Sequence, residues 1–242
     1  MMKSEATMGS DTSPTPAQTQ QDEIYTTLRQ WFSLGRFAPG ERLKIRDLAA
    51  LMGSGIMPVR AALQRLCADG AVVNIPNAGV AVPRLSQVEF DDLLKLRMLL
   101  EGEAAERGSA LLGAAGKQTL QALVHTMDKA LNEADAKAYL AANDAFHVLL
   151  YKAAGSPLLF GLIDTLWLKA GPISNRLFDA ADSLKVLNHA HTELVAALAK
   201  GDHYGVRQAV EKDIFVAGQY IRRALSHDRK DTTSSTSNEV QG

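Results

Sequence analysis

The segment LMGSGIMPVRAALQRLCADG, residues 51–70, passes two glycines and a proline before an apolar run that carries arginines. The spacing of this run predicts an amphipathic helix. Its apolar face comprises Val59, Ala62, Leu63 and Leu66. Pro58 near the start costs little stability, because the N–H that proline lacks would have no partner in the first helical turn. The segment is either a core helix with solvated charges or a helix that presents its first turn to an anionic partner.

Two more helices are predicted upstream of this segment. The first is IYTTLRQWFSLGRF, residues 24–37, in which large apolar residues recur at helical spacing. The second is RDLAALMG, residues 46–53, which should turn Leu48, Ala49 and Leu51 inward and end at its glycine. Because only a few residues separate the second helix from the quoted one, the pair predicts a helix-turn-helix.

The residues that follow predict a hairpin. AVVNI (71–75) and VAVP (80–83) are short β-like runs, and the turn residues 76–79 join them. Three helices and a hairpin are typical of a winged helix-turn-helix domain, which we place at residues 21–85. Residues 1–20 are rich in Ser, Thr, Pro and Gln, and this composition predicts a disordered tail.

The second part of the chain has a different pattern, with long amphipathic helices and no strand signal. We expect six helices, at residues 87–112, 116–132, 135–154, 157–179, 182–200 and 202–226. They predict an all-helical antiparallel bundle at residues 86–226, followed by a disordered tail at 227–242. The predicted fold class is therefore mainly α, with a winged helix-turn-helix before a six-helix bundle.

The overall composition limits the possible classes of function. The chain is 46% hydrophobic with a formal net charge of -1, which suits a real core and excludes a protein that coats nucleic acid uniformly. A single cysteine, Cys67, excludes an intrachain disulfide and fits a reducing cytoplasm. No apolar run approaches the ~20 residues that a membrane span needs. We expect a cytoplasmic protein without a membrane segment.

Basic residues nevertheless gather around the quoted helix. Arg42, Lys44, Arg46, Arg60 and Arg65 are opposed in this region by only three acidic residues. A helix-turn-helix places the beginning of its second helix in the major groove of DNA, and a local positive charge is what phosphates require. Taken alone, the pattern fits solvated charges on a small domain equally well.

Specific motifs decide between these alternatives. Pro39-Gly40 and Leu43 lead into Leu48-Ala49, then Pro58-Val59-Arg60 and Ala62-Leu63 follow, and Gly79 lies at the tip of the wing. These motifs resemble the GntR family of bacterial transcription regulators. The resemblance implies a homodimer on a palindromic double-stranded operator. It implies that the residues in contact with DNA are Lys44, Arg46, Ile56, Met57, Arg60 and Gly79.

One departure from the family pattern affects DNA recognition. Ile56 stands where relatives place an arginine that reaches the DNA, and Gly55 precedes it in a segment where relatives have Ser and Arg. An isoleucine can make apolar contact with the methyl group of thymine. We therefore expect an atypical operator or weaker binding.

In the predicted bundle, polar residues interrupt apolar stripes. Asn143 and His147 lie on the stripe of the third helix, His191 on that of the fifth, Asp213 on that of the sixth and Arg97 on that of the first. A buried carboxylate without a partner is costly, so Asp213 needs one if it faces inward. Imidazole and carboxylate ligands suit Zn²⁺, Ni²⁺ or Mn²⁺. The spacing alone favours a hydrogen-bonded polar cluster over a metal site.

A second resemblance makes a metal site the favoured interpretation of these polar residues. NDAFHVLLYKAAGSPLL (143–159), HTELVAALAKGD (191–202) and LRMLLEGEAAE (96–106) are similar to the FCD-type effector domain of the FadR branch. Many members of this branch bind a divalent metal, so the resemblance implies a site for Zn²⁺, or for Ni²⁺ or Mn²⁺. Its implied ligands are Asn143, His147, His191 and Asp213. The first and last depart from the commonest pattern of Asp and His, and Asp144 is an alternative first ligand.

The same resemblance implies an effector. Members of the branch bind small organic acids beside the metal, which implies a carboxylic acid in contact with Arg97, Asn175 and Arg176. For Arg97, a surface ion pair with Glu101 at i,i+4 is the alternative. We expect His189 to be a solvated neighbour of the site.

The predicted function is that of a ligand-responsive transcriptional regulator, with repression as the expected sense. One alternative is a metal-free regulator in which the four polar residues bind the effector directly. Another is a metal-dependent hydrolase, but no general base is placed nearby and neither Gly-x-Ser-x-Gly nor His-Glu-x-x-His occurs. We therefore expect no enzymatic activity.

The DNA-contact role of Arg60 is testable by substitution. We expect Arg60→Ala to weaken DNA binding while the melting temperature changes little, because an arginine whose exposed side chain contacts DNA adds little to the stability of the folded protein. Binding assays and thermal unfolding of the same sample measure the two effects. A large fall in melting temperature with DNA binding retained would contradict this role.

Overall fold

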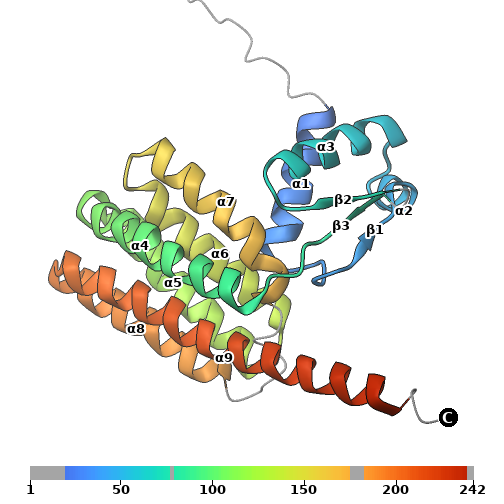
Figure 1. Cartoon of the computed structure of the whole chain (residues 1–242). Coiled ribbons are helices and arrows are strands. Elements are labelled where there is room, and N and C mark those ends of the chain that lie inside the picture. The colour runs from blue at the N-terminus through green and yellow to red at the C-terminus, as the bar shows by residue number, and fades with distance from the viewer. Residues whose placement is uncertain (1–19, 77–78, 175–182, 239–242) are drawn as a thin grey trace, which may run out of the picture.

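The computed structural model describes residues 20–76, 79–174 and 183–238, with side chains throughout except at 183–187 and 224–238. An N-terminal domain of three helices and a small sheet packs against one end of a helical bundle (Figure 1). The predicted fold class, mainly α, is confirmed.

The N-terminal domain has the elements expected of a winged helix-turn-helix. They are α1 (Gln20–Ser33), β1 (Arg42–Leu43), α2 (Ile45–Leu51), α3 (Ile56–Ala68), β2 (Val73–Ile75) and β3 (Gly79–Ala81). The whole predicted apolar face of α3 is buried, and Pro58 lies in its first turn as predicted. In the sheet, β3 pairs antiparallel with β2 as the predicted hairpin and with β1 on its other side. The strand β1 was not predicted, because two residues carry no periodic signal.

One inward-facing residue of α2 was predicted wrongly. Leu48 and Ala49 are buried, but Leu51 is 58% exposed. Met52, just beyond the helix, packs against the core instead. The reason is angular: four residues advance a helix by little more than one turn, so Met52 returns to the face of Leu48, whereas Leu51 points away from it.

The bundle contains six described helices, each of which begins within two residues of its predicted start, while the predicted end of the fourth, residue 179, lies outside the described residues. They are α4 (Gln87–Leu111), α5 (Ala114–Asn132), α6 (Ala136–Lys152), α7 (Pro157–Ser174), α8 (Ser183–Lys200) and α9 (His203–Asn238). A capping box starts α4, because Ser86 accepts from the Glu89 N–H and the Glu89 side chain accepts from the Ser86 N–H. α9 continues beyond the predicted end at residue 226, into the segment for which composition predicts a disordered tail. No glycine or proline from Gln219 to Asn238 interrupts it.

The two domains share α7. Leu168 is fully buried and belongs to the hydrophobic core of the N-terminal domain, together with Phe32 of α1. One turn later, a Cβ built on Gly171 would lie 1.9 Å from the Phe32 carbonyl oxygen. The backbones of α1 and α7 therefore touch, and no residue with a side chain fits at this crossing. In Figure 1, α7 reaches α1 at its C-terminal end.

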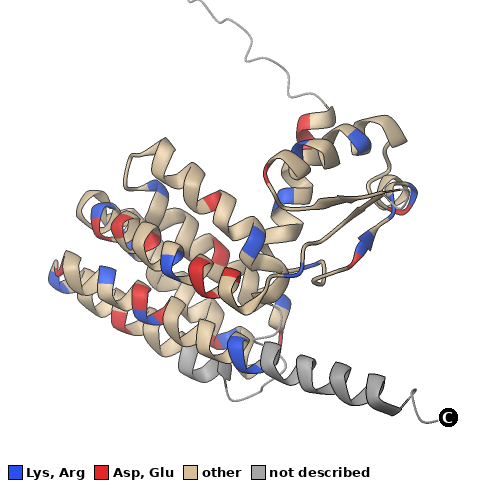
Figure 2. Ribbon diagram, in the orientation of Figure 1, with Lys and Arg blue, Asp and Glu red and all other residues tan. Residues whose placement is uncertain are grey.

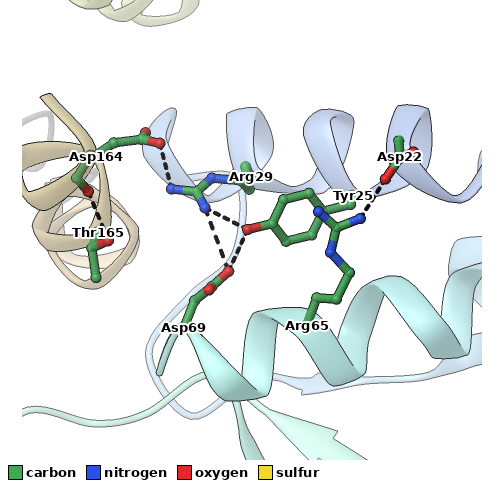
Figure 3. A network of polar contacts seen from close by, with 8 residues as sticks. Asp22, Tyr25, Arg29, Arg65, Asp69, Asp164 and Thr165 are labelled. Atoms are coloured by element: carbon green, nitrogen blue, oxygen red, sulfur yellow. Dashed lines mark hydrogen bonds and ion pairs between the residues drawn. The ribbon is translucent and has the colours of Figure 1, made fainter. Parts of the chain in front are cut away.

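A polar network extends this interface to α3 (Figure 3). Arg29 of α1 donates to Asp164 of α7 at 2.5 Å and to the Tyr25 hydroxyl at 2.5 Å, and it lies 3.5 Å from Asp69. Tyr25 in turn donates to Asp69, the residue that caps the C-terminus of α3. Burial raises the pKa of the Asp164 carboxyl, and the Arg29 guanidinium opposes this effect. One arginine thus links α7 to the end of α3.

The close approach at Gly171 predicts a large difference between two glycines of the same helix. We expect Gly171→Ala to destabilise the protein by about 1–3 kcal/mol, because the new methyl group would overlap backbone atoms of α1. Gly161→Ala is the matched control, since a Cβ there meets nothing within 4 Å and alanine favours the helix. Thermal unfolding should show a lower Tm for Gly171→Ala and an equal or higher Tm for Gly161→Ala. Equal Tm values for both variants would contradict the close crossing of the two helices.

Candidate metal centre

Three predicted ligands from three helices meet inside the bundle. The potential ligand atoms of His147 (α6), His191 (α8) and Asp213 (α9) all lie within 4.8 Å of one another. His147 Nε2 is 3.2 Å from His191 Nε2 and 3.5 Å from Asp213 Oδ2. In a tetrahedral zinc site with bonds of about 2.1 Å, two ligand atoms lie roughly 3.4 Å apart. The spacing of the three side chains therefore fits such an ion.

Packing and hydrogen bonds set the orientation of His147. The ring of Phe146 meets the rings of His147 and His191 edge-on, with centroids 5.4 and 5.0 Å away. His147 Nδ1 lies 2.9 Å from the Tyr151 hydroxyl, which lies 3.1 Å from Glu101 Oε2. Because an ionised Glu101 can only accept, Tyr151 donates to it and accepts from His147 Nδ1–H. This tautomer leaves the lone pair of Nε2 directed at the cluster.

The electrostatics of the cluster keep Asp213 ionised. Burial alone would raise its pKa, but His191, His147 and the Arg97 guanidinium hold the pKa below its usual value. Two buried imidazoles and one carboxylate are a donor set that suits Zn²⁺ and also Ni²⁺ or Mn²⁺. Such an ion would keep at least one position for another ligand.

A cavity of about 100 Å³ opens beside the cluster, between α4, α6, α7 and α9. Asn143 lines it together with His147 and Asp213, so the predicted fourth ligand lies at the same cavity. Asp144 also lines it but does not belong to the cluster of three ligands. The volume holds several water-sized groups, which is enough for a small organic molecule and too little for a polymer.

Arg97 lies at the cavity and also pairs with Glu101. It lines the cavity, and its Nε donates to Glu101 Oε1 at 2.6 Å. The pair is not on the surface, however, because Glu101 is only 1% exposed. The helical spacing of α4 turns Glu101 into the bundle, where Tyr151 is its second partner. His189 is 68% exposed and lies 3.3 Å from Glu193, so it is a solvated neighbour as predicted. Asn175 and Arg176 lie outside the described residues.

The residues predicted to contact DNA are exposed on the N-terminal domain. Lys44, Arg46 and Arg60 are exposed, and among the described residues none of them has an ion-pair partner. Figure 2 shows basic segments on β1 and α2 at this end of the molecule. Ile56 and Met57 are exposed at the start of α3, and Gly79 begins β3 with φ +87°.

Arg65 does not add to this positive surface. It pairs with Asp22 at 2.6 Å, and its guanidinium lies over the ring of Tyr25 at 3.8 Å. The charge of Arg65 is therefore compensated by an ion pair within the domain, which the local count of basic residues could not show.

Comparison with known proteins identifies both domains. Residues 20–82 match the model of bacterial regulatory proteins of the gntR family, and residues 92–214, about half of the chain, match the FCD domain. The chain belongs to the GntR family. The resemblance found in the sequence is thereby confirmed for both parts of the molecule.

The relatives of this GntR protein are transcription regulators. McbR of Escherichia coli K12 is 28% identical over 190 residues, which cover 78% of this chain and 86% of McbR. The repressor RspR of E. coli K12 is 23% identical over 213 residues, covering 88% and 93%. The solved structure of E. coli McbR/YncC has a TM-score of 0.81 at 25% identity and covers 86% of this chain and 99% of that one. McbR and RspR are named as a transcriptional regulator and a transcriptional repressor, in agreement with the predicted class of this chain.

A further solved structure supports the fold alone. A putative GntR regulator from Rhodococcus sp. RHA1 has a TM-score of 0.69 at 22% identity, covering 84% of this chain and 97% of that one.

Among the described residues, no helix has the length and apolar character that crossing a membrane requires.

Sequence reasoning missed several residues that shape the site. Tyr151 lies four residues after His147 on the same stripe, so helical spacing could have pointed to it. Trp167 lines the cavity, and its ring lies tilted against that of Tyr151 with centroids 5.8 Å apart. Ser33 of α1 also lines the cavity, and no local pattern predicts that a residue of the N-terminal domain reaches the effector domain.

The ligand assignment remains a prediction that metal analysis tests. We expect the purified protein to hold about one equivalent of Zn, Ni or Mn per chain, and His147→Ala and His191→Ala to lose it. His189→Ala is the matched control and should retain the metal, because this histidine is exposed. Elemental analysis of protein prepared without an affinity tag or chelator measures the content. Unchanged metal in both cluster variants would show that the ligand set is wrong.

Proposed function

We propose that this protein is a repressor whose affinity for operator DNA is set by a small carboxylic acid, bound beside a divalent metal in the bundle cavity. It acts in the cytoplasm as a homodimer on palindromic DNA. The metal is Zn²⁺, with Ni²⁺ or Mn²⁺ as alternatives. The observation that carries the proposal is that one helix, α7, is both a wall of the cavity and a part of the core of the N-terminal domain.

The arrangement of α7 makes the cavity and the winged domain mechanically dependent. Trp167, Gly171 and Ser174 line the cavity, while Leu168, about 100° round the helix from Trp167, packs into the N-terminal core. Ser33 at the end of α1 closes the cavity from the other domain. A ligand that displaces α7 therefore displaces α1 as well, because packed interfaces do not deform continuously.

The Arg29 network carries such a displacement to α3. Arg29 contacts Asp164 of α7 on one side and Asp69, at the end of α3, on the other. Since α3 is the helix that a helix-turn-helix places in the major groove, the network connects cavity occupancy with the orientation of the DNA-contacting helix.

The chemistry of the cavity favours a small carboxylic acid. A carboxylate oxygen would take the remaining position of the metal ion. Arg97 lies on the same wall, and the N–H groups that it does not give to Glu101 can donate to a second carboxylate oxygen. Leu93, Ile214 and Ile221 provide an apolar lining for the remainder of the molecule.

Two observations support the homodimer and the repressor role. Val88, Leu96 and Leu99 lie on one side of α4 and are 78%, 41% and 58% exposed, which suits a contact with a second copy. A two-fold axis would place two winged domains on half-sites about one helical turn apart. The relative RspR is named a repressor.

A metal-free regulator is a second candidate, because His147 and His191 also lie at hydrogen-bond distance from each other. With one Nε2 protonated, the 3.2 Å contact between His147 and His191 is a hydrogen bond, and the Asp213 carboxylate lies 3.5 Å from His147 Nε2. Asn143 and the cluster would then bind the carboxylic acid directly. Metal content separates the two candidates.

A fluorescence and DNA-binding experiment tests the function. In Trp31→Phe, Trp167 is the single remaining tryptophan and lies in the cavity wall, so its emission reports ligand binding. A panel of small mono-, di- and tricarboxylic acids is titrated with and without Zn²⁺. We expect at least one acid to change Trp167 emission and to alter the Kd for a duplex selected from random DNA by about 5–150-fold.

Variants at the interface test the transmission. Arg29→Met should bring the ratio of the DNA Kd with the acid to the DNA Kd without it toward one. The acid should still change Trp167 emission in this variant. Arg107→Met, which removes an exposed pair on α4, is the control and should keep the ratio. An acid that binds without changing DNA affinity in the wild type would contradict the regulatory role. No binding by any acid would contradict the proposed effector class.

A further inference from the structure

The turn between α2 and α3 exposes three large apolar side chains. Leu51, Ile56 and Met57 are 58%, 43% and 69% exposed. We call these three residues the apolar tip. No side-chain hydrogen bond caps the start of α3, because its N-cap residue is Gly55. Neither the core nor the cap therefore accounts for apolar residues at these positions.

The surroundings of the apolar tip indicate a polyanionic partner. Lys44, Arg46 and Arg60 are exposed without ion-pair partners in the described parts of the chain. No acidic residue occurs in the first turn of α3. In the bundle, by contrast, Arg97 and Arg207 are paired with carboxylates. A protein partner of ordinary composition needs no such basic frame, whereas the phosphates of DNA do.

Base chemistry identifies what the apolar tip meets. In the major groove, base edges present hydrogen-bond donors and acceptors, and thymine alone adds an apolar group, its C5-methyl. We propose that Ile56 and Met57 contact thymine methyl groups and so specify A·T pairs beside the base contacted by Arg60. The inference rests on the proposed function, since it assumes that α3 lies in the major groove.

Helix geometry places these contacts relative to each other. Ile56 and Arg60 are four residues apart, which is about 6 Å along the helix axis. This distance corresponds to roughly one or two base-pair steps of 3.4 Å. Arginine prefers the O6 and N7 acceptors of guanine. The half-site should therefore contain a thymine within one or two base pairs of a guanine.

Replacing thymine by uracil removes the methyl group and nothing else. The half-site is first obtained by selecting random duplexes with the full-length protein. Each thymine is then replaced singly by deoxyuridine, and the Kd is measured. We expect about a three- to fivefold loss of affinity at one or two thymines beside the guanine, as for the exposure of one buried methyl group. Thymines elsewhere in the duplex should show no effect.

Alanine variants show which residue makes the contact. In Ile56→Ala and Met57→Ala, the variant that has lost the contact should bind the thymine and uracil duplexes equally well. Both positions are exposed, so the fold should be preserved. Leu111→Ala removes an equally exposed apolar side chain, 67% accessible on α4, and should keep the full uracil effect.

The possible failures are distinguishable. A selection that enriches no motif would contradict DNA recognition itself and thus the proposed function. An enriched half-site that lacks thymine, or that tolerates uracil at every position, would overturn only the inference about Ile56 and Met57. A loss of affinity on uracil substitution that persists at the same thymine in both alanine variants would overturn it as well, because another residue would then contact that methyl group.

Discussion

The contact between the backbones of α1 and α7 governs the architecture of this protein. Gly171 has no Cβ, so the two helices approach until their main chains touch. This approach brings Leu168 into the N-terminal core and Ser33 to the wall of the cavity. A single crossing therefore joins two domains that would otherwise fold around separate cores. The proposed dependence of DNA binding on a ligand in the bundle rests on this shared helix.

Charge is distributed according to role rather than evenly. A net charge of -1 conceals a winged domain in which Lys44, Arg46 and Arg60 have no ion-pair partner among the described residues. In the bundle, by contrast, Arg97, Arg107 and Arg207 are each paired. Exposed ion pairs stabilise proteins only slightly. The paired arginines thus mainly fix geometry, while the unpaired ones around α3 retain their full charge for a partner.

The polar cluster in the bundle shows how an apolar core tolerates charged groups. Glu101 and Tyr151 orient His147, and Asp213 is held ionised by the histidines and Arg97. Each member has partners, which avoids the large cost of a buried charge left alone. A network of this kind holds its side chains in one arrangement, as both a metal site and a specific ligand site require.

Periodicity in the sequence determined the secondary structure and the inward direction of His147, His191 and Asp213, because a helix repeats every 3.6 residues whatever surrounds it. Motifs of the winged domain likewise determined its family. Only the tertiary structure decided that Leu51 is exposed, that Arg65 is neutralised by Asp22, and that Ser33 reaches the cavity. These outcomes depend on residues distant in the chain or on small angular differences at the ends of helices. Local spacing contains no information about either, because they arise only when helices pack: within the N-terminal domain for Leu51 and Arg65, and between the two domains for Ser33.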